Sequence, residues 1–84
     1  MTFDVGPMPA PPTAATLHAA ARAYMRQLLR VDPHFWIARR FLELKTRGTM
    51  QGHRLRIEDG QSSFEIGADD SEPGRLLIVY AAVL

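Results

Sequence analysis

Residues 53–67 read HRLRIEDGQSSFEIG, and this stretch decides the fold because apolar and polar residues alternate on both sides of Asp59-Gly60. A two-residue Asp-Gly loop is a strong hairpin signal, since both turn residues need positive φ, which Gly adopts freely and Asp tolerates. The predicted register places Arg54 opposite Glu65 and Arg56 opposite Ser63. One face of this hairpin then carries Leu55, Ile57, Phe64 and Ile66, and the other carries Arg54, Arg56, Ser63 and Glu65.

The segment after the hairpin is an acidic turn-rich loop, GADDSEPG, followed by RLLIVYAAVL to the chain end. The second of these predicts a strand that is apolar on both faces. Such a strand is either buried in the middle of the sheet, or its edge and outer face are covered by another copy or another protein. The pattern therefore allows a homodimer through the C-terminal strand.

The residues before the hairpin predict a short strand at 2–5 and two helices. Three prolines within residues 9–12 forbid both a helix and a central strand, so the first helix begins after Pro12, with Thr13 as its N-cap. Asp32-Pro33 ends this helix and starts the second, which Gly48 closes. The apolar stripe of the first helix is Leu17, Ala21, Tyr24, Leu28 and Val31, widened by Met25 and Leu29.

Together these elements predict one α+β domain over residues 1–84, because the chain is too short for two independent cores. Its parts are an N-terminal strand and arm (1–12), a helical hairpin (13–47) and a small, mainly antiparallel sheet of three to four strands (53–84). The chain start has no signal-peptide pattern and no apolar run reaches membrane-spanning length, so we expect a soluble, cytoplasmic protein with no membrane contact.

Metal and cofactor chemistry have no support in the sequence. The chain has no cysteine, so it has neither a disulfide nor a thiolate metal site. His18, His34 and His53 are far apart and have no ligand-spaced carboxylate beside them. We therefore expect no metal and no cofactor.

The net charge of +1 hides an uneven distribution of charge. Residues 1–56 carry nine basic and three acidic side chains, whereas residues 57–84 carry one basic and six acidic ones. This asymmetry fits an anionic partner for the first part, either a nucleic acid or an acidic protein segment. Alternatively, the two parts neutralise each other within the fold. On the first helix His18, Arg22, Arg26 and Arg30 recur at i, i+4 spacing, without acidic partners.

Trp36 lies on the side of the second helix that faces away from the predicted core, beside Arg39 and Arg40. It is either an anchor for a partner, with Arg40 stacked on the indole, or a core residue covered by the proline-rich arm. The candidate partner-binding residues are Arg22, Arg26, Arg30, Trp36 and Arg40.

The hairpin resembles the signature of the RelE/ParE toxin superfamily, a group of small bacterial toxins with an aromatic-R-[LI]-R-[VI]-x-[DR]-Y-R-[VI]-[IL]-[YF] hairpin. RLLIVY also looks like the last strand of that family, and the order of strand, helical hairpin and antiparallel sheet agrees. The residues that fall into the pattern are His53, Arg54, Leu55, Arg56, Ile57, Asp59 and Phe64.

The resemblance implies one of two activities and a protein partner. RelE-like members cleave mRNA on the ribosome without a metal, using basic side chains and sometimes Tyr or His, whereas ParE-like members bind DNA gyrase. Both are held inactive by an antitoxin. By this resemblance the candidate catalytic residues of a metal-independent endoribonuclease are His53, Arg54, Arg56, Arg75 and Tyr80. By parity His53 belongs to the apolar face of its strand. Gln61 replaces an arginine of the family pattern, and the last strand stops at Val83-Leu84.

Three functions follow from these features. The first is a RelE/ParE-like toxin that acts by gyrase-type target binding or by ribosome-dependent mRNA cleavage. The missing arginine and the short last strand favour target binding or a lost activity over cleavage. The second is a non-enzymatic inhibitor or regulator, of the phage or plasmid type, that binds a protein with the same scaffold. The third is a nucleic-acid-binding module, which lacks support from an aromatic strand face, a Gly-rich loop or a helix-turn-helix pattern.

Overall fold

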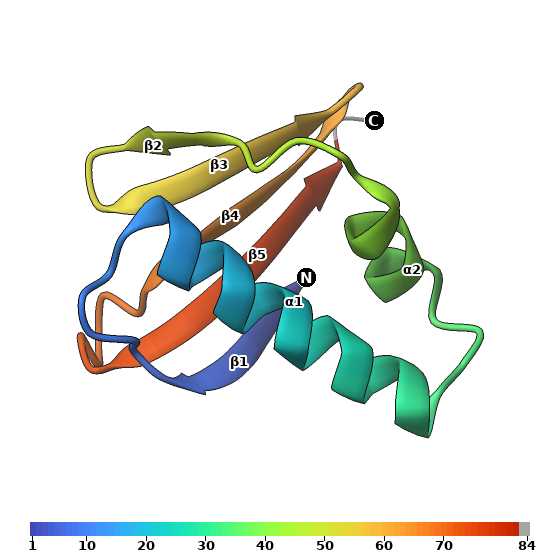
Figure 1. Ribbon diagram of the computed structural model, residues 1–84, viewed down its shortest axis with the longest axis horizontal. Helices are drawn as coiled ribbons and strands as arrows, with labels where there is room; N and C mark the ends of the chain where they lie inside the picture. The colour runs from blue at the N-terminus through green and yellow to red at the C-terminus, as the bar shows by residue number, and fades with distance from the viewer. Residues whose placement is uncertain (83–84) are drawn as a thin grey trace.

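A computed structural model describes residues 1–82, which form a five-stranded sheet with two helices on one of its faces (Figure 1). The α+β class is therefore confirmed. In chain order the elements are β1 (Thr2–Pro7), α1 (Ala14–Val31), α2 (Trp36–Glu43), β2 (Thr49–Gln51), β3 (Arg54–Asp59), β4 (Ser62–Ala68) and β5 (Arg75–Ala82).

The sheet has the order β1-β5-β4-β3-β2, and every neighbouring pair of strands is antiparallel. The first strand pairs with the last one, and the ammonium group of Met1 donates a hydrogen bond to the Tyr80 carbonyl at 2.9 Å. The sheet has one strand more than the three to four expected. The additional strand is β2, whose three residues are too few to give a period-2 pattern.

The first helix follows its prediction at the N-terminus and departs from it at the C-terminus. Thr13 is the N-cap, and its Oγ1 accepts a hydrogen bond from the Thr16 amide at 3.2 Å. Leu17, Ala21 and Met25 are buried against the sheet. Val31 was expected in the same stripe, but 87% of it is exposed because the last turns of α1 extend beyond the sheet (Figure 1).

The second helix is shorter than predicted at both ends. Pro33 does not begin it: the Asp32 side chain instead accepts a hydrogen bond from the His34 amide at 3.1 Å in a turn, and the helix begins at Trp36. It ends at Glu43, so Gly48 is not its C-cap. Gly48 has φ +84°, and a Cβ at this position would collide with the backbone carbonyl oxygen of Arg56. Residues 44–48 are therefore an extended connection that passes close to β3 before β2 begins.

The core lies between the helices and the inner face of the sheet. Phe64 of β4 is at its centre, with ring centroids 5.1 Å from Phe41 and 4.9 Å from Tyr80. The buried apolar residues are Phe3, Leu17, Ala21, Met25, Ile37, Ala38, Phe41, Leu55, Ile57, Phe64, Ile66, Leu76 and Ile78. The predicted inner face of the hairpin is thus confirmed in full.

The register of the hairpin differs from its prediction. The two-residue loop is Gly60-Gln61, so Asp59 pairs with Ser62 and Arg56 lies opposite Glu65. Gly60 has φ +63° while Gln61 does not have positive φ, which is the pattern of a type II′ turn with Gly in the first central position. This turn keeps Asp59 in β3, where its carboxylate reaches Arg40 of α2. This one-residue shift of the turn leaves the same residues on each face of the hairpin, but Glu65 pairs with Arg56 instead of Arg54.

Candidate protein-binding face

The predicted catalytic residues do not come together. Arg54 and Arg56 lie on the outer face of the sheet, away from the helices, whereas the Tyr80 side chain packs on the core residue Phe64 on the inner face. The Tyr80 hydroxyl donates a hydrogen bond to Ser62 Oγ at 3.0 Å. His53 was expected on the apolar face, but it is exposed in the turn between β2 and β3. Arg75 begins β5, so it lies near the opposite end of that strand from Tyr80.

Each arginine on the outer face of the sheet already contacts a carboxylate. Arg54 Nη2 lies 3.1 Å from Asp70 Oδ1, and Arg75 Nη2 lies 2.8 Å from Asp4 Oδ1. Arg56 lies between two glutamates, with Nε 3.4 Å from Glu58 Oε1 and Nη1 3.8 Å from Glu65 Oε2. These contacts offset the positive charge that a transition-state phosphate would require.

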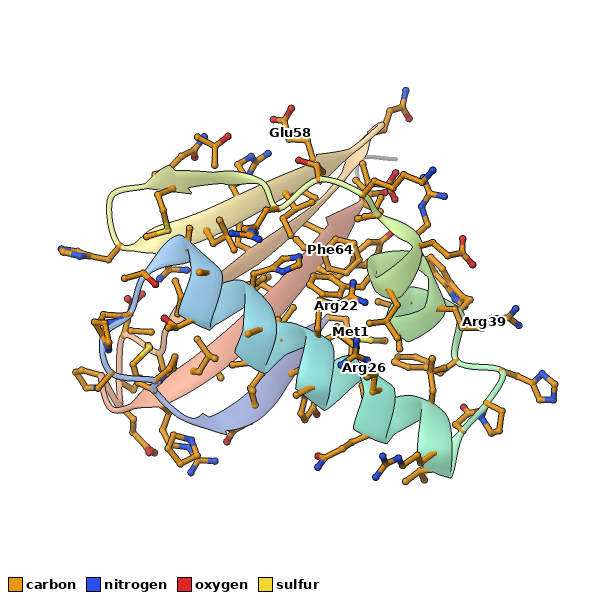
Figure 2. The ribbon with its side chains drawn as sticks, viewed as in Figure 1. Met1, Arg22, Arg26, Arg39, Glu58 and Phe64 are labelled. Carbon is orange, nitrogen blue, oxygen red and sulfur yellow. The ribbon has the colours of Figure 1, made fainter. Side chains whose placement is uncertain are left out.

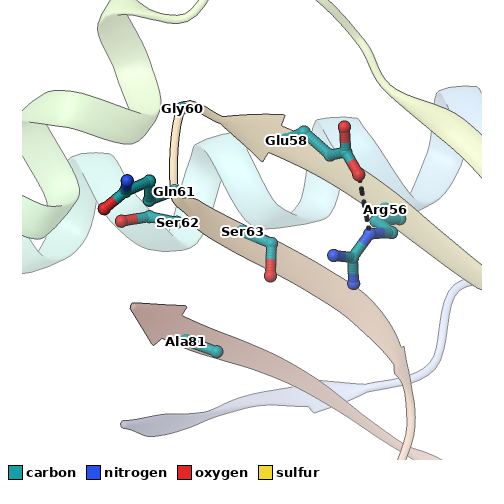
Figure 3. Close-up of a pocket in the computed structure, with 7 residues that line it drawn as sticks. All are labelled: Arg56, Glu58, Gly60, Gln61, Ser62, Ser63 and Ala81. Carbon is teal, nitrogen blue, oxygen red and sulfur yellow. Dashed lines mark hydrogen bonds and ion pairs between the residues drawn. The ribbon is translucent and has the colours of Figure 1, made fainter. Parts of the chain in front are cut away.

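A hollow of about 440 Å³ lies on the outer face of the sheet beside Arg56 (Figure 3). It is lined by Arg56, Glu58, Gly60, Gln61, Ser62, Ser63 and Ala81. Gln61 contributes a neutral amide, and the nearby Tyr80 phenol lies on the other face of the sheet. The hollow therefore combines one guanidinium with one carboxylate and small polar groups. It does not contain the cluster of basic groups that metal-independent RNA cleavage needs.

The helical layer has the opposite charge balance. Six cationic side chains between residues 22 and 47 make no ion pair with any carboxylate of residues 1–82. We call them the basic helical surface: Arg22, Arg26, Arg30, Arg39, Lys45 and Arg47. Figure 2 shows Arg22 and Arg26 on α1 and Arg39 on α2. The two parts of the chain thus neutralise each other only in part, and the excess positive charge is on the helices and on the connection that follows α2.

His18 lies close to two cations of the basic helical surface, Arg22 and Arg47. Its ring is half-buried, with its centroid 5.9 Å from that of Phe41. Burial lowers the pKa of His18, and the charges of Arg22 on the same helix and of Arg47 from the connection to β2 lower it further. Arg47 and Arg22 therefore both lie close to His18, so the basic helical surface continues from α1 into the connection between α2 and β2.

Trp36 is exposed. The sequence left open whether the proline-rich arm covers it, but 59% of the residue is accessible. Its ring meets the edge of Tyr80 nearly at a right angle, with centroids 5.7 Å apart, and Tyr80 is itself fixed by Phe64 and Ser62. The indole is therefore held in place from one side and free on the other. A hollow of about 300 Å³ beside it is lined by His34, Trp36, Arg39, Arg40 and Glu43.

Arg40 is bound to Asp59, so its guanidinium joins α2 to the end of β3. Its Nε and Nη2 donate hydrogen bonds to the two carboxylate oxygens at 2.7 and 2.5 Å. The hydrogen bond from Arg40 is the main reason that the pKa of Asp59 is lowered. Arg40 thus acts as a structural residue beside Trp36, a role that no periodicity in the sequence indicated.

Arg39, Lys45 and Arg47 belong to the basic helical surface but were absent from the predicted partner-binding set. None of the three falls on the i, i+4 row of Arg22, Arg26 and Arg30. The helical pattern placed Arg39 beside Trp36, and the regional charge count included all three. Within residues 1–82 no group of three or more His, Asp or Glu side chains is placed to hold a metal ion. Neither α1 nor α2 combines the length and the apolar character needed to cross a membrane.

Comparisons of the chain with protein-family models, with curated proteins and with solved structures gave no match.

Proposed function

We propose that this protein acts by binding an acidic partner protein through the basic helical surface, as a RelE/ParE-like toxin of the target-binding type that does not cleave RNA. The observation that carries the proposal is the division of the arginines into two groups. Arg54, Arg56 and Arg75 on the sheet have carboxylate partners, whereas the cations of the basic helical surface have none within residues 1–82.

Cations without partners favour a protein ligand that supplies carboxylates. Arg22, Arg26 and Arg30 form a row on consecutive turns of α1, so an acidic segment lying along the helix meets one guanidinium per turn. The exposed indole of Trp36 adds an apolar contact of the kind that often dominates binding energy at protein interfaces. Both an antitoxin and a target such as a gyrase subunit fit this chemistry. Cleavage of mRNA on the ribosome would instead need the candidate catalytic residues to lie together, and the fold places them apart.

Induced expression of paired variants in a bacterium tests the proposal. We expect the natural chain to arrest growth, and a chain with Arg22→Gln, Arg26→Gln and Arg30→Gln to lose that effect. The matched control, Arg54→Gln with Arg56→Gln, changes arginines on the sheet and should still arrest growth. Glutamine keeps helix propensity and removes only charge, so far-UV circular dichroism should show the same helix content in both variants.

The mRNA of the arrested cells tests the absence of cleavage. Primer extension should give the same pattern with and without induction. Ribosome-dependent cuts that disappear in the Arg54/Arg56 variant would overturn the proposal in favour of the nuclease. Harmless expression of the natural chain would overturn the toxin assignment and favour the inhibitor or regulator.

We expect the partner to be encoded by a gene adjacent to that of this chain, because toxins of this superfamily are encoded beside their antitoxins. We expect the product of a small acidic open reading frame at that position to relieve the arrest and to bind the purified chain. Single-stranded RNA and duplex DNA serve as competitors at the same ionic strength. Tighter binding to either nucleic acid than to the acidic protein, with a steep loss of affinity in salt, would instead support the nucleic-acid-binding module.

A further inference from the structure

Within residues 1–82 no helix covers the outer face of β5, which is apolar from Leu77 to Ala81. Leu76 and Ile78 point to the helices and are fully buried, whereas Leu77, Val79 and Ala81 point the opposite way. Both helices pack on the inner face, so Leu77 and Val79 stay half-buried and Ala81 is exposed. We call these three side chains the β5 outer stripe. The sequence indicated a strand that is apolar on both faces, and the structure leaves one of those faces open.

Three cross-strand neighbours of the stripe are small, and the two charged ones, Asp4 beside Leu77 and Glu65 beside Val79, form ion pairs with Arg75 and Arg56. Thr2 of β1 lies opposite Val79, and Ser63 of β4 lies opposite Ala81. Gly67 lies opposite Leu77 and has no side chain; a Cβ there would come within 2.8 Å of Arg54 Cγ, because the Arg54 stem lies over it. Figure 3 views this face with the helices behind the sheet and shows Ser63 and Ala81 on neighbouring strands.

The charges around the stripe are already paired within the same face. Arg75 contacts Asp4 on one side and Arg54 contacts Asp70 on the other, while Arg56 of β3 contacts Glu58 on its own strand and Glu65 on β4. A strongly charged partner would have to break these pairs. A partner with the same balanced pattern would not, and an identical chain has that pattern.

We propose that two copies of this chain stack face to face through their β5 outer stripes. With a two-fold axis along β5, the β1 side of one sheet faces the β4 side of the other. Asp4 then lies opposite Gly67 of the second copy, beside the Arg54 stem, so no carboxylate meets its own copy. The basic helical surface points away from this interface, where its unpaired cations do not repel the second copy. Two copies cannot pair edge to edge through β5, because β1 and β4 are hydrogen-bonded to both of its edges.

Sedimentation equilibrium of the purified chain over a range of concentrations is the first test. We expect a reversible dimer of twice the 9.4 kDa chain mass. Val79→Lys should raise the dissociation constant about tenfold or more, because it places two ammonium groups at the centre of an apolar interface. In the monomer this lysine lies beside Glu65, its cross-strand neighbour, so the fold should tolerate it. The matched control is Val31→Lys, the same substitution at an exposed apolar residue of α1.

Single cysteines give a second measurement that does not depend on a disruptive substitution. The chain has no cysteine, so Val79→Cys and Val31→Cys each carry one unique thiol. A bis-maleimide about 10 Å long, the spacing of stacked sheets, should join Val79→Cys into a dimer and leave Val31→Cys monomeric. A monomer at every concentration, equal masses for the natural chain and Val79→Lys, or equal cross-linking at both positions would overturn the proposal. None of these results bears on the basic helical surface, so the two proposals fail separately.

Discussion

Gly48 is the residue on which the placement of the connection between α2 and β2 depends. Its φ is +84°, and a Cβ there would collide with the Arg56 carbonyl oxygen and would lie 2.6 Å from Ile57 Cγ1. Both obstacles belong to β3, which is held between β4 and β2 in the sheet. Gly48→Ala therefore forces a shift of backbone against backbone, because neither obstacle is the end of a flexible side chain.

The expected loss of stability combines two costs. A residue with a Cβ in the left-handed region costs about 1–2 kcal/mol, and forcing extra atoms into a packed site costs typically about 1–3 kcal/mol more. Gly48→Ala should thus lower the free energy of unfolding by about 2–5 kcal/mol. For a domain of this size about 1 kcal/mol corresponds to a melting temperature shift of 4–8 °C, so we expect a drop of about 10 °C or more.

Gly52→Ala is the matched control. Gly52 has φ +64°, and nothing lies within 4 Å of the position where its Cβ would be. This variant should lose only the backbone cost of about 1–2 kcal/mol. Urea unfolding followed by far-UV circular dichroism measures both variants, and an unchanged slope shows that the denatured state is the same in each.

Equal losses for Gly48→Ala and Gly52→Ala would refute this argument. Gly48→Ala would then cost no more than the same change at an unobstructed left-handed position, which would mean that Gly48 makes no close contact with β3. A loss of more than about 1 kcal/mol beyond that of Gly52→Ala supports the close approach to β3.

Three further predictions concern the pKa of two groups and the core. The pKa of Asp59 is lowered chiefly by its hydrogen bond with Arg40, so this stabilisation is present above the ordinary Asp range and lost as pH falls through the lowered pKa. In urea titrations at several pH values, the natural chain's advantage over Asp59→Asn should shrink below about pH 4. Burial, Arg22 and Arg47 lower the pKa of His18, so the folded state binds this proton less readily and stability should fall as pH drops below about 6.5. Arg22→Gln should raise the His18 pKa in an NMR titration, and an unchanged value would refute the proposed crowding. Phe64→Ala removes the ring that joins Phe41 and Tyr80, and should cost about 3–5 kcal/mol in thermal or urea unfolding.

The α+β class and the buried face of the hairpin could be predicted because side-chain alternation alone decides them. A shift of the turn by one residue changes the cross-strand partners and leaves Leu55, Ile57, Phe64 and Ile66 on the same face. The register itself was not predictable from Asp59-Gly60. It depends on a contact with Arg40, a residue 19 positions earlier in the chain, which holds Asp59 at the end of β3.

The start of α2 shows how a local signal yields to the tertiary structure. Asp32-Pro33 is a good helix start in isolation, yet Asp32 closes a turn with His34 and the helix begins three residues after Pro33. The later start places Ile37, Ala38 and Phe41 against the sheet. β2 escaped prediction for a different reason: its three residues become a strand only because β3 pairs with them.

One part of the candidate site could likewise be predicted from the sequence, and another part could not. The α1 row of arginines could be read directly from i, i+4 spacing, because that geometry belongs to one helix. The separation of the candidate catalytic residues could not be predicted. It depends on which face of the sheet each strand residue takes and on carboxylates far away in the sequence, such as Asp4 beside Arg75.

The arginine row on α1 has no explanation in the stability of the fold. Arg22–Arg26 and Arg26–Arg30 are like-charge pairs at i, i+4, and each destabilises a helix by about 0.2–0.5 kcal/mol. The first turn of α1 contains no acidic residue that would favour the helix dipole. The helix is held by the Thr13 capping box and by its buried face. Because a bound acidic segment would remove the repulsion, hydrogen exchange of the α1 amides should slow when such a segment binds, and by less when Arg26→Gln has already reduced the repulsion.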